Sequence, residues 1–543
     1  MTAFPDTFNL VDYFLMDRLA EGKGDRLALR FGERSHTYDE VAKKSLAFMN
    51  ALFAAGVRRG ERVLIVIHDM PPFAWAIMGT FARGAVVAMG NPEAPIDNIR
   101  YLVEYTRATA LVTHPHIADA IVSQIRGGAL ASELQRIFVV PDVATGQDPE
   151  GAASGIDDPL VVPLTRALGQ APEHGRPIVH RDEPAMWLFT SGSTGEPKAN
   201  VHSHRDFAFN TEVYAKKTIG YREGDVTVSV PRLFFGYATG TNLFFPFAVG
   251  GTSCLFSERP TPESIARAVL MYQPTVVTNV PTMIGKLLDH DETLRADGKN
   301  GLDWASVRFS LSAGEALPEA LLQRWQARYA SDIYDGIGSA EMFHIYASNR
   351  PGDIKPGSLG KVVDGYELRV LPEGADGPGA APCAAGEIGV LWVKGDSVSH
   401  GYWLDRDRSW KTFHGHWCRT GDLFHVDEGG YLYFAGRADD LLKVGGQWVA
   451  PLEVEACLMR HESVASVAVI GVEQDGLQKT KAYVVLRPGF AASEAIAQQL
   501  QEWARARLAK YKYPRLIEFV TDLPKNDRGK VDKKALRARE LPS

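Results

Sequence analysis

The sequence has few cysteines. It contains four among 543 residues, at Cys254, Cys383, Cys418 and Cys457. None forms a Cys-x-x-Cys pair, so the chain lacks both the common zinc-binding spacing and a disulfide framework. Scattered single cysteines are typical of proteins in a reducing compartment, and we expect a cytoplasmic protein.

Long apolar runs and an excess of basic charge are also missing. No apolar segment approaches the roughly 20 residues that span a bilayer, and residues 1–6 lack the basic and apolar regions of a signal peptide. The 59 lysines and arginines against 66 aspartates and glutamates give a net charge of −7. Neither nucleic acid nor an anionic membrane is therefore expected as a partner.

A chain of 543 residues is too long for one hydrophobic core, so at least two domains are expected. Short apolar runs at 62–67, 85–89 and 110–113 read as buried strands, and amphipathic helical patterns separate them. Such alternation predicts βαβ units and a mostly parallel sheet. Five more candidate strands follow at 226–230, 252–256, 275–278, 308–312 and 331–334, and residues 143–182 read as a surface connection.

The residue pattern changes near residue 365, where glycine-rich turns separate shorter candidate strands. The last hundred residues read as a compact α+β unit, with helices at 451–459 and 493–508 and strands at 464–472 and 480–486. The predicted fold class is therefore α/β: large N-terminal sheets of βαβ type, a small β-rich subdomain and a small α+β C-terminal domain. The expected boundaries are 1–437 for the large domain, 438–442 for a hinge and 443–543 for the small domain.

The segment 189–198, Phe-Thr-Ser-Gly-Ser-Thr-Gly-Glu-Pro-Lys, follows an apolar strand at 185–189. A helical pattern begins near His204. Glycines allow a ligand to approach the backbone closely, while hydroxyls, N–H groups and a lysine can bind phosphate oxygens. The spacing differs from the common P-loop, because Pro197 precedes Lys198 and no Ser or Thr follows it. We interpret the segment as a phosphate-binding loop; the alternative is a surface turn without a ligand.

Two further polar turns follow candidate strands. They are Ala-Gly-Glu-Ala-Leu-Pro at 313–318 and Asp-Gly-Ile-Gly-Ser-Ala-Glu at 335–341. In open α/β sheets, ligands bind at the carboxyl ends of strands. All three turns could therefore share one ligand, although each could also be an ordinary strand-to-helix connection.

Five motifs occur in one order: the loop at 190–198, the turn ending in Glu341, Thr-Gly-Asp at 420–422, Gly-Arg-Ala-Asp at 436–439 and Gly-Lys at 529–530. Together they resemble the adenylate-forming superfamily of acyl-CoA synthetases, carrier-protein adenylation domains and luciferases. The resemblance covers nearly the whole chain.

Within that superfamily, Leu-Phe-Phe-Gly-Tyr at 233–237 and Asp-Gly-Ile-Gly-Ser at 335–339 look most like the benzoate-CoA ligase group. The resemblance implies an ATP-dependent ligase that activates benzoate or a substituted benzoate, such as 2-aminobenzoate (anthranilate), and transfers it to coenzyme A. The alternatives are an enzyme that loads an aryl acid onto a carrier-protein thiol, a nucleotide-sensing protein without catalysis and, more remotely, a luciferase-like oxygenase.

The resemblance also implies an ATP and AMP site. Its residues would be Thr190, Ser191, Gly192, Ser193, Thr194, Gly195, Lys198, Gly314, Glu315, Ala316, Asp335, Gly336, Ile337, Gly338, Ser339, Asp422, Arg437 and Lys530. The 190–198 loop would hold the β- and γ-phosphates, the 314–316 turn and Asp335 the adenine, and Asp422 and Arg437 the ribose. Glu341 would hold Mg²⁺, which prefers carboxylate oxygens.

Four residues are expected to be catalytic by resemblance: Lys198, Glu341, Lys443 and Lys530. Lys530 would bridge the carboxylate and the α-phosphate during adenylation. A swing of the mobile small domain about Asp439 would then replace Lys530 with Lys443 and the Gly445-Gly446 turn, which would bind coenzyme A.

The aryl ring would lie against Gly236, Tyr237, Phe245, Ile337 and His344. Aromatic walls suit a planar ring, although most of the crowded phenylalanines at 234–247 must be core. Two positions depart from the usual superfamily motif Tyr-Gly-x-Thr-Glu: Ile337 replaces the aromatic residue and Ala340 the threonine. The expected partners are an aryl carboxylate, ATP and coenzyme A, with the chain a monomer or homodimer.

Overall fold

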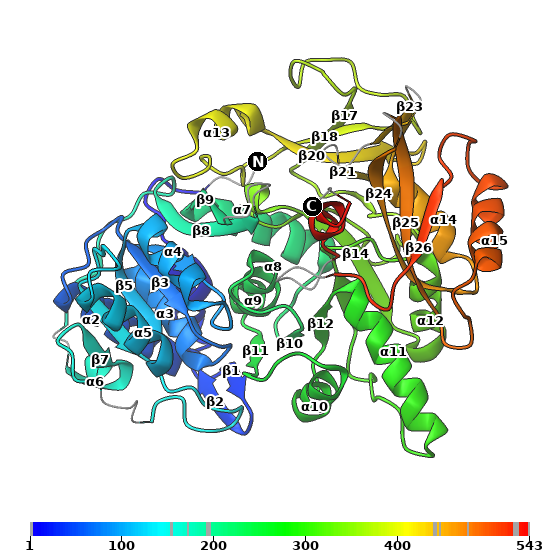
Figure 1. The fold of residues 1–543 in the computed structure, drawn as a ribbon. Helices are drawn as coiled ribbons and strands as arrows, with labels where there is room; N and C mark the ends of the chain where they lie inside the picture. Colours follow the sequence, from blue (N-terminus) through cyan, green and yellow to red (C-terminus); the bar gives the residue numbers. More distant parts are fainter. Residues whose placement is uncertain are drawn as a thin grey trace. The chain divides into compact units, whose positions relative to one another are not determined.

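The computed structural model describes residues 4–151, 156–170, 173–191, 197–437, 442–444, 447–474, 477–524 and 531–540 (Figure 1). The chain divides into two compact units. The first is Met1–Leu368 with Val393–Cys418, and the second is Arg369–Trp392 with Arg419–Ser543. Among the described helices, none combines the length and apolar character that a membrane crossing requires.

A seven-stranded sheet forms one half of the first unit, in the order β7-β6-β5-β3-β4-β8-β9. All neighbouring strands are parallel except the hairpin β8–β9. The strands are β3 (Arg62–Val66), β4 (Val86–Met89), β5 (Ala108–Thr113), β6 (Arg136–Val139), β7 (Val161–Pro163), β8 (Pro184–Ser191) and β9 (Pro197–Ser203). Helices α3 (Pro71–Ala82), α4 (Ile96–Thr106) and α5 (Pro115–Arg126) connect them.

Apolar periodicity explains how these helices pack. Ile99, Leu102 and Val103 of α4 share one helical face and are buried in the same cluster as Leu64 of β3 and Leu111 of β5. Helix α3 is apolar on all sides and is buried throughout. Burying a leucine-sized side chain contributes about 1.5–3 kcal/mol, so this cluster fixes the sheet and its helices as one body.

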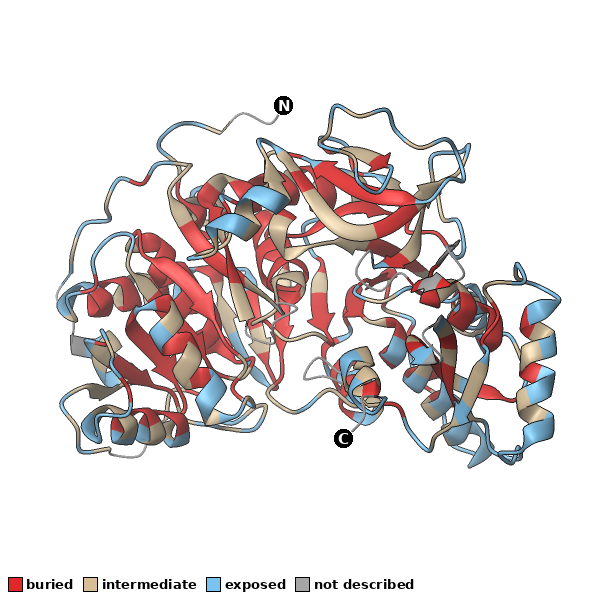
Figure 2. Cartoon of the chain, turned by 45° about the horizontal axis from the view of Figure 1, so that its top comes forward, coloured by how far each residue is buried: buried red, intermediate tan, exposed pale blue. Residues whose placement is uncertain are grey.

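A nine-stranded sheet forms the other half of the first unit, in the order β16-β15-β14-β13-β12-β10-β11-β1-β2. Its strands are β1 (Leu27–Phe31), β2 (Arg34–Thr37), β10 (Val226–Ser229), β11 (Thr252–Leu255), β12 (Val276–Asn279), β13 (Phe309–Ser312), β14 (Asp332–Gly338), β15 (Ile345–Ser348) and β16 (Lys361–Val362). Helices α10 (Pro262–Tyr272), α11 (Pro281–Ala296) and α12 (Glu319–Tyr329) carry buried residues of its core. The inner strands β12 and β13 are buried at every residue, whereas the edge strands β2 and β16 are not. Figure 2 shows the same burial along most strands of the chain.

The first unit contains further helices. They are α1 (Asp17–Ala20), α2 (Tyr38–Ala54), α6 (Leu164–Gln170), α7 (His204–Asn210), α8 (Gly236–Thr239), α9 (Phe245–Val249) and α13 (Arg406–Thr412), with the helical segments η1 (Asp12–Met16), η2 (Thr211–Ile219), η3 (Gly240–Phe244) and η4 (Ala340–Met342). The capping residue Ser203 ends β9 and starts α7, close to the expected helix start at His204.

The second unit contains a three-stranded sheet of β24 (Val464–Gln474), β25 (Leu477–Leu486) and β26 (Leu516–Phe519), with helices α14 (Pro451–Met459), α15 (Glu494–Arg505) and α16 (Lys533–Ala538). Leu500 of α15 is buried, and Ile496 and Trp503 pack on the same cluster. The hairpin of β22 (Leu442–Val444) and β23 (Gln447–Val449) precedes α14.

A further sheet has the order β17-β18-β20-β19, and β21 also pairs with β20. Its strands are β17 (Glu367–Leu371), β18 (Gly389–Lys394), β19 (Phe413–His414), β20 (Trp417–Val426) and β21 (Leu432–Arg437). The β-rich region and the small α+β region are therefore both present, and the predicted α/β fold class is confirmed.

Two expectations about local structure were wrong, and one strand had not been predicted. A strand, β9, lies between the 190–198 loop and α7, because residues 197–203 pair antiparallel with β8. The connection at 143–182 contains β7 and α6. The expected turn at 335–341 is a strand as far as Gly338, because β14 continues and pairs antiparallel with β15.

The glycines of β14 explain this last difference. A side-chain carbon on Gly336 would lie 2.8 Å from the carbonyl oxygen of Ala347, and one on Gly338 would lie 2.4 Å from that of His344. Only glycine lets β15 approach this closely. The sequence pattern of a glycine-rich turn therefore marks a tightly paired strand here.

Candidate active site

The hairpin β8–β9 carries the expected phosphate-binding loop. Thr190 pairs with Lys198 across the hairpin, and the ammonium of Lys198 lies 3.2 Å from the carboxylate of Asp405. The Lys198 side chain is 12% exposed, so its charge is held beside one acidic partner. The side chain of Ser191 and the residues Gly192, Ser193, Thr194 and Gly195 lie outside the described part of the chain.

Glu341 lies on the short helical turn η4. Its Oε1 accepts a hydrogen bond from the hydroxyl of Tyr402 at 2.8 Å, and its backbone oxygen accepts one from the N–H of Ser399 at 2.9 Å. The ring of His202 contacts the carbonyl oxygen of Ala340 at 2.6 Å through Nε2. These contacts fix the position of the Glu341 carboxylate.

Lys198 and Glu341 are brought together by one segment, 402–405. Lys198 contacts Asp405 at its end, and Glu341 contacts Tyr402 at its start. The backbone of this segment is tied to β9, because the N–H of Trp403 donates to the carbonyl oxygen of Ala199 at 2.9 Å. A cation and a carboxylate on one rigid frame can bind the phosphates of a nucleotide and a metal ion that accompanies them.

A second group joins the expected adenine residues. The carboxylate of Asp335 on β14 accepts a hydrogen bond from the N–H of Leu317 at 3.4 Å, which places the 314–316 turn beside it. Gly314 has a φ of +87°, and Glu315 accepts a hydrogen bond from the hydroxyl of Thr282 at 2.8 Å. Gly314 and Ala316 are exposed. The turn after β13 and strand β14 thus present a backbone surface next to a buried acid.

A third group is aromatic and buried. The ring of His344 lies 4.8 Å from that of Phe245 and 5.3 Å from that of Tyr237, measured between centroids. Tyr214 and Tyr221 complete it, with ring centroids 5.5 Å from His344 and 5.5 Å from Phe245, respectively.

Two polar atoms in this group have no hydrogen-bond partner among the described residues: Nδ1 of His344 and the hydroxyl oxygen of Tyr237. Burial lowers the pKa of His344 to about 3, so the ring is neutral. Its Nε2 lies 3.0 Å from the carbonyl oxygen of Tyr237 and must carry the proton, because a carbonyl only accepts. Nδ1 is therefore an unsatisfied acceptor. Burial also raises the pKa of Tyr237 well above its ordinary value, so its hydroxyl can donate.

The other two expected aryl residues lie near this group. Gly236 begins α8, and a side-chain carbon there would lie 3.3 Å from Leu188 of β8. Ile337 is half-buried on β14, pairs with Ala347 and precedes Gly338. Ser339 follows as the residue before η4.

The expected ribose residues belong to the second unit. Asp422 pairs with Arg437 across β20 and β21, and the Arg437 Nε lies 3.5 Å from the Asp422 carboxylate. Gly421, just before Asp422, has a φ of +74°, a left-handed conformation that glycine adopts without strain. The backbone of Lys443 lies in β22, opposite Trp448. Asp439, Gly445, Gly446, Lys530 and the Lys443 side chain lie outside the described residues.

Comparison with known proteins decides the family. The model of the AMP-binding enzyme family matches residues 16–403, and that of the AMP-binding enzyme C-terminal domain matches residues 453–530. The chain belongs to the AMP-binding enzyme family. The expected adenylate-forming relationship is therefore confirmed.

Two relatives of this AMP-binding enzyme are named as ligases of an aryl acid and coenzyme A. This chain is 38% identical over 538 residues to a benzoate–CoA ligase of Thauera aromatica, and the match covers 98% of this chain and 96% of the relative. It is 31% identical to an anthranilate–CoA ligase of Pseudomonas aeruginosa, with coverage of 89% and 87%.

Two solved structures share its fold. The anthranilate CoA ligase AuaEII in complex with anthranoyl-AMP matches with a TM-score of 0.87 at 34% identity, covering 99% of this chain and 98% of that one. A benzoate CoA ligase from Burkholderia xenovorans LB400 matches with a TM-score of 0.84 at 34% identity, with coverage of 98% and 100%.

Four contacting residues of this AMP-binding enzyme were not predicted. Tyr402 and Asp405 hold the expected Glu341 and Lys198, but they lie outside every motif and far along the chain. Tyr214 and Tyr221 complete the aromatic group. In the sequence, Tyr214 and Tyr221 are distinguished only by their position between the 190–198 loop and the 233–237 motif.

Asp335 makes the stability of this AMP-binding enzyme depend on pH. Burial raises its pKa from 3.8 to about 7, against a smaller opposing effect of the Ser312 hydroxyl and nearby N–H groups. Between pH 4 and 7 the unfolded chain loses a proton that the folded chain keeps, so stability falls as pH rises through this window. Asp335→Asn removes the titrating carboxyl group and therefore this loss of stability.

We therefore expect the free energy of unfolding of Asp335→Asn, relative to the parent, to rise between pH 4 and 7 by up to about 4 kcal/mol. Urea unfolding at several pH values measures this difference. A difference that stays constant over the window would show that Asp335 is ionised in the folded protein at pH 4 as well as at pH 7.

Proposed function

We propose that the protein is an ATP-dependent aryl-CoA ligase. It activates benzoate or a substituted benzoate, such as 2-aminobenzoate, as the acyl-AMP with release of pyrophosphate. It then transfers the acyl group to coenzyme A and releases AMP. The observation that carries this proposal is the buried group of Tyr237, Phe245 and His344 in a chain whose relatives are benzoate– and anthranilate–CoA ligases.

The chemistry explains the arrangement. A carboxylate oxygen is a poor leaving group, so the acid must first attack the α-phosphate of ATP. This attack expels pyrophosphate and gives the acyl-AMP, a mixed anhydride from which AMP leaves readily when a thiol attacks the carbonyl carbon. Charge develops on phosphate and acyl oxygens in both steps, and positioned cations and N–H donors lower the barriers. Lys198, with the hydroxyls of the 190–194 loop, binds the β- and γ-phosphates in this proposal, and Lys530 bridges the carboxylate and the α-phosphate.

Glu341 fits a role in holding Mg²⁺. The donor is a carboxylate oxygen, which this hard cation prefers, and the hydroxyl of Tyr402 orients the carboxylate. When bound, Mg²⁺ would neutralise charge on the phosphate oxygens. Asp422 and Arg437 bind the ribose in this proposal, and the 314–316 turn with residues 335–339 lines the adenine.

The aromatic group suits a planar acid with a small ring substituent. Its faces and edges can pack on a ring, while the unpartnered Nδ1 of His344 and hydroxyl of Tyr237 can bind an amino or hydroxyl group. An alkyl chain lacks the flat face that these rings can pack on, so the aromatic walls favour an aryl acid, and the two polar atoms favour a substituted ring over an unsubstituted one.

ATP–pyrophosphate exchange with a panel of acids tests the substrate class. We expect benzoate, 2-aminobenzoate and hydroxybenzoates to support exchange far better than octanoate of the same concentration. A preference for octanoate would contradict the aryl assignment. Absence of exchange and of AMP formation with every acid would favour a nucleotide-sensing protein instead.

Gly240 offers a selective test of the aryl group. A side-chain carbon there would lie 2.6 Å from Cδ2 and Nε2 of His344 and 3.0 Å from Phe245. Gly240→Ala must therefore displace the histidine, at a cost of about 1–3 kcal/mol. We expect KM for benzoate to rise about tenfold or more, with KM for ATP unchanged.

The matched control is Gly285→Ala in helix α11, where the nearest atom to the new carbon is Leu321 Cδ1 at 3.9 Å. Both variants replace a helical glycine, so only the steric effect differs. An unchanged KM for benzoate in Gly240→Ala would place the aryl ring elsewhere.

The acceptor and the domain movement are parts of the same proposal. We propose a large domain at 1–437, a hinge at 438–442 that includes Asp439, and a small domain at 443–543 that carries Lys443, Gly445 and Gly446 to coenzyme A. Formation of soluble aryl-CoA in an assay without carrier protein would support coenzyme A, and not a carrier-protein thiol, as the acceptor. A cytoplasmic location, and a monomer or homodimer, stay predictions of the sequence.

A further inference from the structure

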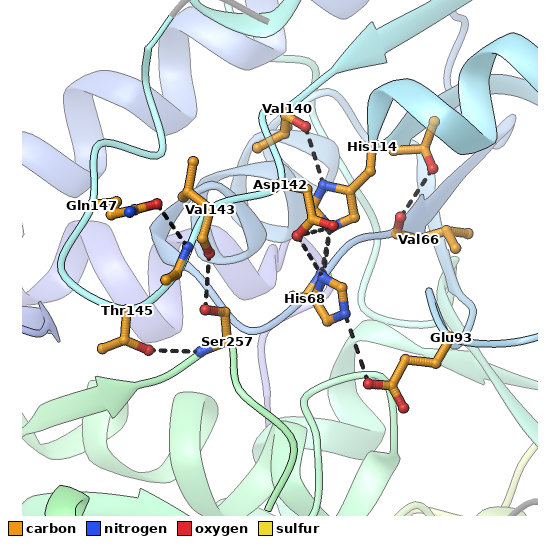
Figure 3. A network of polar contacts seen from close by, with 12 residues as sticks. Val66, His68, Glu93, His114, Val140, Asp142, Val143, Thr145, Gln147 and Ser257 are labelled. Carbon is orange, nitrogen blue, oxygen red and sulfur yellow. Dashed lines mark hydrogen bonds and ion pairs between the residues drawn. The ribbon is translucent and has the colours of Figure 1, made fainter. Parts of the chain in front are cut away.

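Four polar residues follow four adjacent parallel strands of the seven-stranded sheet. His68 follows β3, Glu93 follows β4, His114 follows β5 and Asp142 follows β6, and the strand order is β6-β5-β3-β4. The carboxyl edge of such a sheet gathers the residues that follow each strand. Figure 3 shows the side chains of His68, His114 and Asp142 converging there.

Within the described ranges, these three residues form a group whose possible ligand atoms all lie within 4.8 Å of one another. Nδ1 of His68 lies 3.0 Å from Nε2 of His114 and 3.1 Å from Oδ1 of Asp142, and the last two atoms are 4.0 Å apart. Ligands of a tetrahedral zinc ion, with bonds of about 2.0–2.1 Å, are about 3.3 Å from one another. The observed spacings lie on both sides of this value.

An oxygen faces the second nitrogen of each imidazole, at hydrogen-bond distance for His114 and beyond that distance for His68. Nδ1 of His114 lies 3.1 Å from the carbonyl oxygen of Val140, to which it must donate, so Nε2 carries the lone pair that faces the group. Nε2 of His68 lies 4.0 Å from a carboxylate oxygen of Glu93 (Figure 3). Histidines that bind metals usually donate their second N–H to a carboxylate or a backbone carbonyl.

We propose that His68, His114 and Asp142 form a zinc site whose fourth position is open to water. Two imidazoles and one carboxylate suit zinc, whereas Mg²⁺ and Ca²⁺ favour oxygen ligands alone. Zn²⁺ binds the Nδ1 lone pair of the neutral His68 ring, whose single proton then lies on Nε2, on the side of Glu93.

One hydrogen bond opposes zinc binding and limits the affinity. The backbone N–H of His68 donates to Nε2 of His114 at 3.0 Å, so an ion must displace this contact. The side chains differ in exposure: His114 is fully buried, His68 is 19% exposed and Asp142 is 45% exposed. An ion can therefore enter from the side of Asp142.

Zinc at this position would join loops that reach the rest of the first unit. Asp69, next to His68, accepts hydrogen bonds from the N–H of Leu233 at 3.1 and 3.2 Å. Beyond Asp142, the carbonyl oxygen of Val143 accepts a hydrogen bond from the hydroxyl of Ser257 at 2.9 Å. The ion would thus crosslink the loops after β3, β5 and β6, and its expected effect is on stability.

Zinc binding is measured with the untagged full-length protein, stripped of metals and kept in millimolar Mg²⁺, by competition with a chromophoric chelator. We expect about one Zn²⁺ per chain. Loss of an outer partner of a metal ligand costs about 10–100-fold in affinity, so loss of a ligand in His68→Gln or Asp142→Asn should weaken binding by about 100-fold or more. Zinc should raise the Tm of the parent and leave that of Asp142→Asn unchanged.

The matched control is His116→Gln, which removes an exposed histidine beside the group without removing a ligand. It should bind zinc as the parent does. Asp142→Asn changes an exposed side chain, so its fold is not at risk if His68→Gln fails to fold. Failure of the parent to compete for zinc, or equal binding by the parent and Asp142→Asn, would overturn the proposal and leave a hydrogen-bonded histidine pair.

Discussion

Lys530→Ala should abolish formation of the aryl-adenylate and leave the second half-reaction nearly intact. The ammonium of Lys530 is proposed to stabilise charge as the carboxylate attacks the α-phosphate. Removing one such group from a preorganised site costs about 10²–10³-fold in rate. A charge that acts in one transition state only costs rate in that step only. ATP–pyrophosphate exchange with benzoate measures the first step.

Lys443→Ala is the matched partner, because it removes the same charge from the other proposed conformation. It should retain ATP–pyrophosphate exchange and slow the reaction of synthetic benzoyl-AMP with coenzyme A. Single-turnover quenching of that reaction measures the second step for both variants. Loss of the same half-reaction in both variants would contradict the swinging-domain account.

Glu341→Gln should reduce adenylate formation by about 100-fold or more. The substitution keeps the size of the side chain but removes the negative charge that is proposed to hold Mg²⁺. It should also raise the Mg²⁺ concentration needed for half-maximal exchange. ATP–pyrophosphate exchange across a Mg²⁺ series measures both effects.

Tyr402→Phe separates the charge of Glu341 from its orientation. The hydroxyl of Tyr402 donates to Glu341 Oε1 at 2.8 Å, so its loss frees the carboxylate without removing it. A hydrogen bond to a charged group contributes about 1.5–3 kcal/mol, and we expect a smaller loss than in Glu341→Gln. If Glu341→Gln were as active as the parent at every Mg²⁺ concentration, Glu341 would have no role in holding the metal.

Local patterns predicted many of the elements. The apolar run at 62–67 became β3, and helix α14 has the predicted bounds, Pro451–Met459. Both depend on periodicity and end signals within a few residues. The motifs also identified the family, because their order and residue types reflect one shared chemistry.

Long-range pairing explains what the sequence did not reveal. Strand β9 forms only because β8 lies beside it, and residues 336–338 lie in a strand because they pair with β15. Tyr402 and Asp405 meet Glu341 and Lys198 across long stretches of sequence. The β-propensity of such segments depends on their neighbours in space, which a single sequence does not give.

The fate of the carboxylate oxygen tests the central claim most directly. If the acid attacks the α-phosphate and sulfur then attacks the acyl carbon, one oxygen of the acid must remain on AMP. Turnover of benzoate labelled with ¹⁸O at both carboxylate oxygens, with ATP and coenzyme A, should give AMP that carries one ¹⁸O, as mass spectrometry measures. Unlabelled AMP, or label in orthophosphate together with ADP, would contradict activation through an aryl-adenylate.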